Sequence, residues 1–124
     1  RNPAKVGGYR AALAEHGVDF DPELVAAPEA REKPRLAGLE PFVEAAIEKF
    51  LAPPDPATAI FTFNDQRAML AMAVLEKRGL KIGRDVSLAG FGDRAFRSGD
   101  CRWLTSSRIY PYKMGQEAAR VALE

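Results

Sequence analysis

The chain has 124 residues, enough for one domain with a hydrophobic core. Its residues are 47% hydrophobic and 28% charged, and 18 basic against 17 acidic side chains leave a net charge of +1. This balance argues against nucleic-acid binding by the chain itself, and no apolar run approaches the roughly 20 residues of a membrane helix. The single cysteine, Cys101, excludes an internal disulfide and a cysteine-based metal site. The opening Arg1-Asn2-Pro3 lacks the apolar stretch of a signal peptide, so a reducing, cytoplasmic setting is expected.

A helix is predicted over the first 17 residues. Asn2 is a suitable cap, Pro3 suits the first helical position, and Gly17 can end the helix in the left-handed conformation. The apolar segment "ELVAA" at residues 23–27 predicts a short strand, and residues 28–37 read as an exposed loop.

A second helix is predicted over "LEPFVEAAIEKFL", because its apolar residues recur at helical spacing and Pro41 stands near its start. The prolines of "PPDP", at residues 53–56, end that helix.

The most informative stretch is "AIFTFNDQRAMLAMAVLEKRG". Residues 59–63 predict a buried strand, and Asn64 or Asp65 is expected to cap a helix that runs to about Arg78. Gly79 then ends the helix, and an apolar residue follows it as expected after a glycine cap.

Another strand is predicted over residues 86–89, and it leads into the glycine-flanked turn Gly90-Phe91-Gly92-Asp93. Residues 94–103 show no regular pattern, and a final helix is predicted from about Pro111.

Strands that alternate with helices predict an α/β fold with parallel strands and right-handed crossovers. In such sheets, ligands bind at the carboxyl ends of the strands. Two predicted strands end in polar turns, "FND" and "GFGD", and we expect both turns at one edge of the sheet. The chain starts on a helix, so we expect the sheet to be incomplete within it.

The order of these segments resembles the effector-binding domain of the lactose-repressor (LacI) family of bacterial transcription regulators. The resemblance covers nearly the whole chain: "GYRAALAEHGV" with "DPELV", then "TAIFTFNDQRAMLAMAVLEKRGLKIGRDVSLAGFGD", then "LTSSRIYPYKMGQEAARVAL". The Gly-Phe-Gly-Asp variant is also similar to the gluconate-regulator branch of that family.

The resemblance implies a three-layer parallel sheet with flanking helices, an incomplete second lobe of the periplasmic-binding-protein-like fold. Residues 1–124 would form most of this lobe, and the first lobe and the DNA-binding headpiece would lie outside the chain. A small sugar or sugar acid would bind between two lobes and control operator binding by a homodimer. The alternative is a periplasmic sugar-binding protein of a transporter. A further alternative is an enzyme, such as a flavodoxin-like or receiver-type domain. The sequence lacks a phosphate loop of the glycine-lysine kind, a metal cluster and a base–nucleophile pair, so no enzyme activity, cofactor or metal is expected.

The resemblance also implies site residues. The family's basic residue on its first helix matches Lys5, near Arg1, and its Asn-Asp helix start matches Asn64 and Asp65. Its Gly-aromatic-Asp tip matches Gly90, Phe91 and Gly92, followed here by Asp93. A dimer interface is implied for the following residues: Met69, Met72, Arg94, Phe96 and Cys101.

At the tip, the sequence departs from the family, because Gly92 replaces the carboxylate that accepts hydrogen bonds from sugar hydroxyls. A buried carboxylate near an anionic ligand costs several kcal/mol unless it is paired. Its loss, together with Arg1 and Lys5 beside a helix amino end, favours a sugar acid or a phosphorylated sugar.

Simpler roles remain open for the same residues. Asn64 and Asp65 are common helix caps, and Gly90 and Gly92 can serve only a tight turn. The interface methionines can be ordinary core, and Cys101 reads as a packing residue because no histidine can be assigned beside it.

Overall fold

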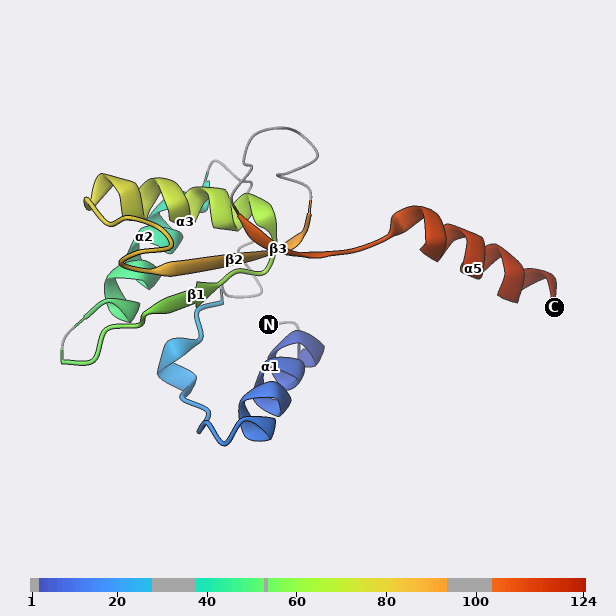
Figure 1. The fold of residues 1–124 in the computed structure, drawn as a ribbon, viewed down its shortest axis with the longest axis horizontal. Coiled ribbons are helices and arrows are strands. Elements are labelled where there is room, and N and C mark those ends of the chain that lie inside the picture. Colours follow the sequence, from blue (N-terminus) through green and yellow to red (C-terminus); the bar gives the residue numbers. More distant parts are fainter. Residues whose placement is uncertain (1–2, 28–37, 53, 94–103) are drawn as a thin grey trace. The chain divides into compact units, whose positions relative to one another are not determined.

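The computed structural model describes residues 3–27, 38–52, 54–93 and 104–124. The chain divides into two compact units, Arg1–Ala52 and Pro53–Glu124, which are described separately (Figure 1).

The first unit contains helix α1 (Pro3–Glu15), the 3₁₀ turn η1 (Pro22–Leu24) and helix α2 (Glu40–Phe50). Helix α1 ends as predicted at Gly17, whose φ of +68° is the left-handed conformation that glycine adopts without strain. After this turn the chain folds back, so that the rings of Tyr9 and Phe20 meet edge to face with their centroids 6.1 Å apart.

The predicted strand over residues 23–27 is wrong, because the structure has the 3₁₀ turn η1 there and no strand. Asp21 accepts a hydrogen bond from the backbone N–H of Glu23, and Pro22 fixes the backbone angle at the first position of the turn. These local contacts outweigh the strand preference of the apolar residues.

Helix α2 forms where the apolar spacing predicts it. Val43 and Ile47, one turn apart, are buried on one side of the helix, as is Leu39 just before it. The "PPDP" segment follows α2 in the sequence, and its first proline lies outside the described residues.

The second unit is built on a parallel sheet of three strands in the order β1 (Ala59–Phe61), β2 (Ser87–Gly92) and β3 (Thr105–Arg108). Helix α3 (Asp65–Lys77) connects β1 to β2 and lies across one face of the sheet (Figure 1), and helix α5 (Pro111–Leu123) follows β3. The predicted α/β class, a parallel sheet with flanking helices, is therefore confirmed.

Three strand assignments of the second unit need correction. The buried strand predicted over residues 59–63 ends at Phe61, and only Ile60 of its three residues is buried. Strand β2 was expected to end at Ala89 but continues to Gly92, because Gly90, Phe91 and Gly92 pair with β3. Strand β3 itself was missed. Its sequence, "TSSR", has no alternation of apolar and polar residues that would indicate a strand.

The core of the second unit lies between α3 and the sheet. Ile60 and Leu88 are directly paired across β1 and β2, and both are buried together with Ala68, Ala71 and Leu75 of α3. The small alanines let the helix approach the strands closely, and Leu75 is fully buried.

The carboxyl end of α3 is closed by a glycine motif. Gly79 has a φ of +77°, and its N–H donates to the carbonyl of Glu76, while the N–H of Leu80 donates to the carbonyl of Leu75. This arrangement confirms the predicted helix end, and it turns the chain back toward β2.

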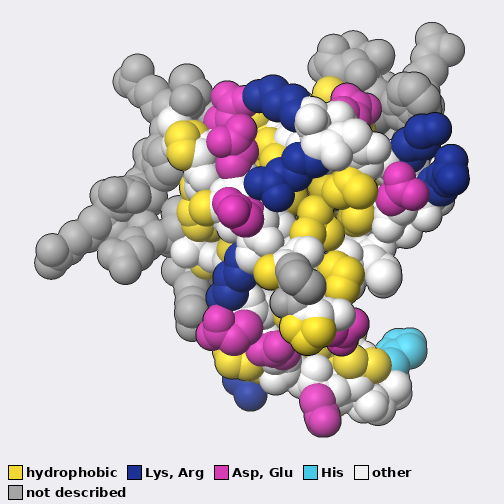
Figure 2. Space-filling model, turned by 90° about the vertical axis from the view of Figure 1, so that its left-hand side faces the viewer, with side chains coloured by type: hydrophobic (Ala, Val, Ile, Leu, Met, Phe, Trp, Pro, Cys, Tyr) yellow, Lys and Arg dark blue, Asp and Glu magenta, His cyan; other side chains and the backbone are white. Residues whose placement is uncertain are grey.

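Helix α5 forms as predicted but has no buried residue. Tyr112, Met114, Val121 and Leu123 are all exposed on it. No helix among the described residues is both long and apolar enough to cross a membrane. On the face that Figure 2 shows, Lys and Arg side chains are interspersed with Asp and Glu.

Candidate functional site

The two polar strand ends lie at the same edge of the sheet. Phe61 pairs with Ala89, and the N–H of Thr62 donates to the carbonyl of Ala89, so β1 and β2 are paired up to the carboxyl end of β1, and β2 continues in the same direction to Gly92. Asn64 and Gly92 follow at this edge, which in parallel sheets is the position of the ligand. The expectation that both turns share one edge is confirmed.

Asn64 caps α3. Its Oδ1 accepts a hydrogen bond from the backbone N–H of Arg67 at 3.0 Å, which satisfies one of the free amides of the first helical turn. The Thr62 hydroxyl, 2.9 Å from the Asn64 carbonyl oxygen, holds the segment before the helix. The capping role is therefore shown, whereas a contact of Asn64 with a ligand remains a prediction.

Asp65, the first residue of α3, is almost completely buried, with 2% of its surface exposed. Its Oδ1 accepts a hydrogen bond of 2.6 Å from the Ser106 hydroxyl of β3, and the same Ser106 oxygen accepts one of 3.0 Å from the backbone N–H of Asp93. The serine therefore links the start of α3 to the turn after β2.

The turn after β2 has an unusual backbone. Gly92 has a φ of +116° and Asp93 one of +55°, the only positive φ of a non-glycine residue in the part of the chain that is described. Aspartate tolerates this conformation better than most residues. Such backbone angles often occur at functional sites and need support from their surroundings.

That support comes from β3. The Asp93 carboxylate forms an ion pair with Nε of Arg108, and Gly92 is paired with Arg108 in the sheet. The two partners differ in exposure: the Asp93 side chain is 10% exposed and that of Arg108 is 53% exposed. Asp65, Ser106, Asp93 and Arg108 thus form one polar network, called here the edge network.

Gly90 is required by the close approach of α3. A Cβ atom at this position would lie 2.5 Å from Oδ1 of Asp65 and 3.3 Å from its Cα. Such distances are shorter than van der Waals contact, so the absence of a side chain at Gly90 allows the edge network to form.

The other predicted ligand residues are distributed differently. Phe91 is half-buried, and because side chains alternate along β2, it points to the face opposite to that of Gly90 and Asp65. Lys5 is exposed on α1, in the other unit. Arg1 lies outside the described residues, so ligand contacts of Lys5 and Arg1 remain predictions.

The sequence did not point to Ser106 or Arg108. Both come from β3, the strand without an apolar pattern, and their contacts depend on the pairing of Gly90 with Ser106 and of Gly92 with Arg108. The only hint was that "TSSR" lies within a segment that resembles the family.

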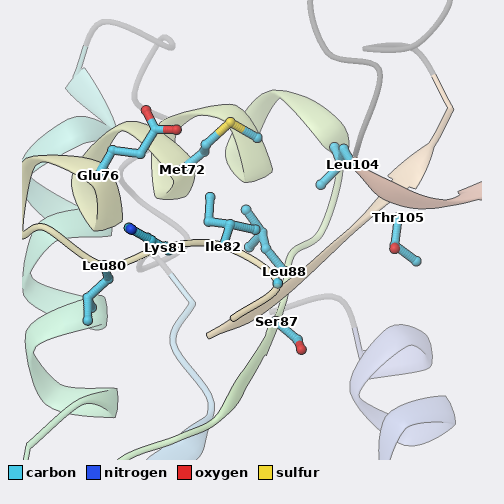
Figure 3. A pocket seen from close by; sticks show the side chains of 10 residues that line it. Met72, Glu76, Leu80, Lys81, Ile82, Ser87, Leu88, Leu104 and Thr105 are labelled. Atoms are coloured by element: carbon cyan, nitrogen blue, oxygen red, sulfur yellow. The ribbon is translucent and has the colours of Figure 1, made fainter. Parts of the chain in front are cut away.

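A cavity of about 380 Å³ lies at the other end of the sheet (Figure 3). Its walls come from the second half of α3, from the loop that follows α3, and from the first residues of β2 and β3: Met72, Glu76, Leu80, Lys81, Ile82, Gly83, Ser87, Leu88, Leu104 and Thr105. Its lining includes no member of the edge network, although Thr105 directly precedes Ser106 in the chain.

Of the residues expected at a dimer interface, Met69 and Met72 are described. Both are half-buried on α3, and Met72 contributes to the cavity wall (Figure 3). Arg94, Phe96 and Cys101 lie outside the described residues. Within the described ranges, no group of three metal-binding side chains occurs.

Comparison with known proteins identifies the family. The model of the periplasmic binding protein-like domain matches residues 6–124, and the chain belongs to this family. The HTH-type transcriptional regulator AscG of Escherichia coli K12 is 31% identical over 113 residues, which cover 91% of this chain and 31% of AscG. The repressor CytR of the same organism is 28% identical over 120 residues, 97% of this chain and 33% of CytR.

Solved structures agree with this assignment. The Escherichia coli repressor ascG superimposes with a TM-score of 0.71 at 29% identity, over 94% of this chain and 40% of that one. A LacI-family sugar-binding regulator from Escherichia coli, complexed with phosphate, gives a TM-score of 0.69 at 30% identity. The superposition covers 90% of this chain and 37% of that one. These relatives are transcriptional regulators rather than enzymes, and the chain spans about a third of the length of the curated relatives described above.

Proposed function

We propose that this chain is most of the second lobe of the effector-binding domain of a bacterial LacI-type transcription regulator. A small molecule binds between this lobe and a first lobe, and its binding controls how a separate headpiece holds operator DNA. In this proposal the protein is a cytoplasmic homodimer without catalytic activity.

One observation above all supports a ligand at this lobe. Asn64 and the Gly92-Asp93 turn lie at the carboxyl edge of a parallel sheet, where the backbone angles are strained and a polar network crosses three elements. Polar residues of this kind at this edge are typical of ligand sites in α/β proteins.

The regulator is preferred over a periplasmic transport protein, which has the same fold. The curated relatives that cover 91% and 97% of the chain are both transcriptional regulators. The near-neutral charge of the chain fits a lobe that contacts DNA only through another domain.

A sugar acid or phosphorylated sugar is the effector class that the tip favours. Gly92 offers no carboxylate to accept hydrogen bonds from neutral sugar hydroxyls. The LacI-family neighbour from Escherichia coli was crystallised in complex with phosphate, and an anionic effector for this chain is consistent with that complex.

The dimer is proposed to form through α3, at Met69 and at Met72, which lines the cavity of Figure 3. Half-buried methionines adapt well to a partner surface. Substitution of Met72 by Glu should shift the full-length protein from dimer to monomer in sedimentation experiments, and an unchanged dimer would contradict this assignment.

The function is tested with the full-length protein and a fragment of its own upstream DNA. A panel of sugars, aldonates and sugar phosphates is added to the protein–DNA complex. Fluorescence anisotropy then measures whether each compound releases the DNA or tightens its binding. A member of the panel that changes DNA affinity supports the proposal, and no change of DNA affinity with any member contradicts it.

A further inference from the structure

The two partners of the ion pair between Asp93 and Arg108 differ in their exposure to solvent. The carboxylate is 10% exposed and the guanidinium 53% exposed, although both belong to the same contact at the carboxyl edge of the sheet. A molecule that approaches this edge from solvent therefore meets mainly the arginine of the pair.

Asp93 is poorly placed to replace the carboxylate that is missing at Gly92. Its carboxylate is paired with Arg108, and its backbone N–H donates to the hydroxyl oxygen of Ser106. Rotating it toward a ligand would break a charge-assisted contact and leave a buried group without its partner.

Arg108 has the opposite properties. Its contact with Asp93 uses Nε, and Asp93 is its only recorded partner among the described residues. A guanidinium has five N–H donors and no acceptor, so the two terminal nitrogens offer only donors. Tethering Nε to a carboxylate also restricts the side chain, which lowers the entropy cost of binding a ligand.

The charges of the edge network are compatible with an anion at Arg108. Asp65 and Asp93 both carry a carboxylate, but Asp65 is 2% exposed and receives the Ser106 hydroxyl, and Asp93 is paired. Each carboxylate is thus hydrogen-bonded and withdrawn from solvent, whereas the cation is at the surface. Arg108 is also the type of side chain that binds carboxylate and phosphate through two parallel hydrogen bonds.

We propose that Arg108, held by Asp93, is a specificity-determining residue of the effector site and donates hydrogen bonds to a carboxylate or phosphate of the effector. This inference rests on the proposed function. It reverses the direction of hydrogen bonding at the tip: the protein donates and the ligand accepts, so a molecule with hydroxyl groups alone binds less well.

The test uses ligands that differ only in the group of interest. Gluconate and sorbitol share the same chain of hydroxyl groups and differ by a carboxylate in place of an alcohol, and glucose phosphate supplies the other oxyanion. Their affinities for the full-length protein are measured by calorimetry. Wild type should bind at least one of the two anions about 10-fold or more tightly than sorbitol, the ratio expected for a charge-assisted bidentate contact.

Three variants separate the roles of Arg108. Arg108→Gln should weaken binding of that anion about 10- to 100-fold and leave sorbitol unchanged. Arg108→Lys should restore part of the affinity, because it keeps the charge but loses the planar fork. Arg84→Gln is the matched control: Arg84 is an exposed arginine of the same unit beside an aspartate, Asp85, but it precedes β2 at the opposite end of the strand.

The outcomes distinguish this inference from the proposed function. If gluconate or glucose phosphate binds tightly and Arg108→Gln binds it equally well, the inference is wrong and the function stands. The same conclusion follows if sorbitol binds as tightly as either anion. If none of the three probes binds at its solubility limit and no sugar alters DNA affinity, both are wrong.

Discussion

Gly90 of β2 and Asp65 of α3 lie so close together that a single methyl group would not fit between them, since a Cβ at Gly90 would be 2.5 Å from the Asp65 carboxylate. This contact decides how α3 sits on the sheet, and it places a buried carboxylate at the edge where a ligand is proposed.

Gly90→Ala should lower the free energy of unfolding by about 1–3 kcal/mol, because overpacking forces α3 or β2 to move. Urea unfolding followed by circular dichroism measures this change. Gly115→Ala is the matched control, since nothing lies within 4 Å of its Cβ position on α5 and the change should be neutral or slightly stabilising. Equal effects of both substitutions would contradict the close packing.

Ser106→Ala should cost about 1–3 kcal/mol of unfolding free energy, because the buried Asp65 carboxylate and the Asp93 amide both lose a hydrogen bond. The neighbouring Ser107→Ala should change stability by less than about 0.5 kcal/mol, because Ser107 is exposed on the same strand. Thermal or urea unfolding compares the pair. A loss for Ser107→Ala as large as for Ser106→Ala would show that the strand tolerates no substitution and would remove the case for the network.

Asn64→Ala should destabilise the protein by about 0.5–2 kcal/mol through loss of the α3 cap, whereas Asn64→Asp should be close to wild type in stability. The two variants also separate capping from ligand binding. If Asn64 contacts an anionic effector, Asn64→Asp should keep the fold but weaken the binding of that effector, which calorimetry measures. Wild-type affinity in Asn64→Asp would leave capping as its only role.

Asp93→Asn and Asp93→Ala should differ in stability although both lose the ion pair with Arg108. Asparagine tolerates a φ near +55° and alanine does not, so the alanine variant should be less stable by about 1 kcal/mol. Unfolding of both variants in the same buffer gives this difference directly. Identical stabilities would indicate that the turn relaxes when the carboxylate is lost.

Leu75→Ala and Leu123→Ala remove the same atoms from opposite environments. Leu75 is fully buried in α3, and its loss should cost about 2–5 kcal/mol by leaving a cavity in the core. Leu123 is 88% exposed on α5, so its loss should be close to neutral for the unit described here. A large loss at Leu123 in the full-length protein would show that another part of that protein covers α5.

The sequence predicted the elements that have strong local signals. Asn64 marked the start of α3 and Gly79 its end, because a cap and a glycine with positive φ are local requirements. The strands β1 and β2 were found from their apolar residues, which are also a local signal, although their ends were not. Residues 23–27 were assigned wrongly because the turn at Asp21 and Pro22 competes with a strand, and apolar content alone does not resolve that competition.

The candidate site was only half predictable. Asn64 and the Gly92-Asp93 turn were found, since each stands at the end of a predicted strand. Ser106 and Arg108 were not, because their importance follows from the register of β2 and β3 rather than from their own sequence. The ion pair between Asp93 and Arg108 was not foreseen either, and a ligand contact of Asp93 remains a prediction.

The pairing of Asp65 with Ser106 joins residues 41 positions apart, and it has a consequence for biosynthesis. During synthesis, β1, α3 and β2 leave the ribosome before β3. Asp65 therefore lacks the hydrogen bond from Ser106 until β3 has been made. Strand β3 therefore completes the edge network as well as the sheet, and a chain that ends before Ser106 lacks this hydrogen bond to Asp65.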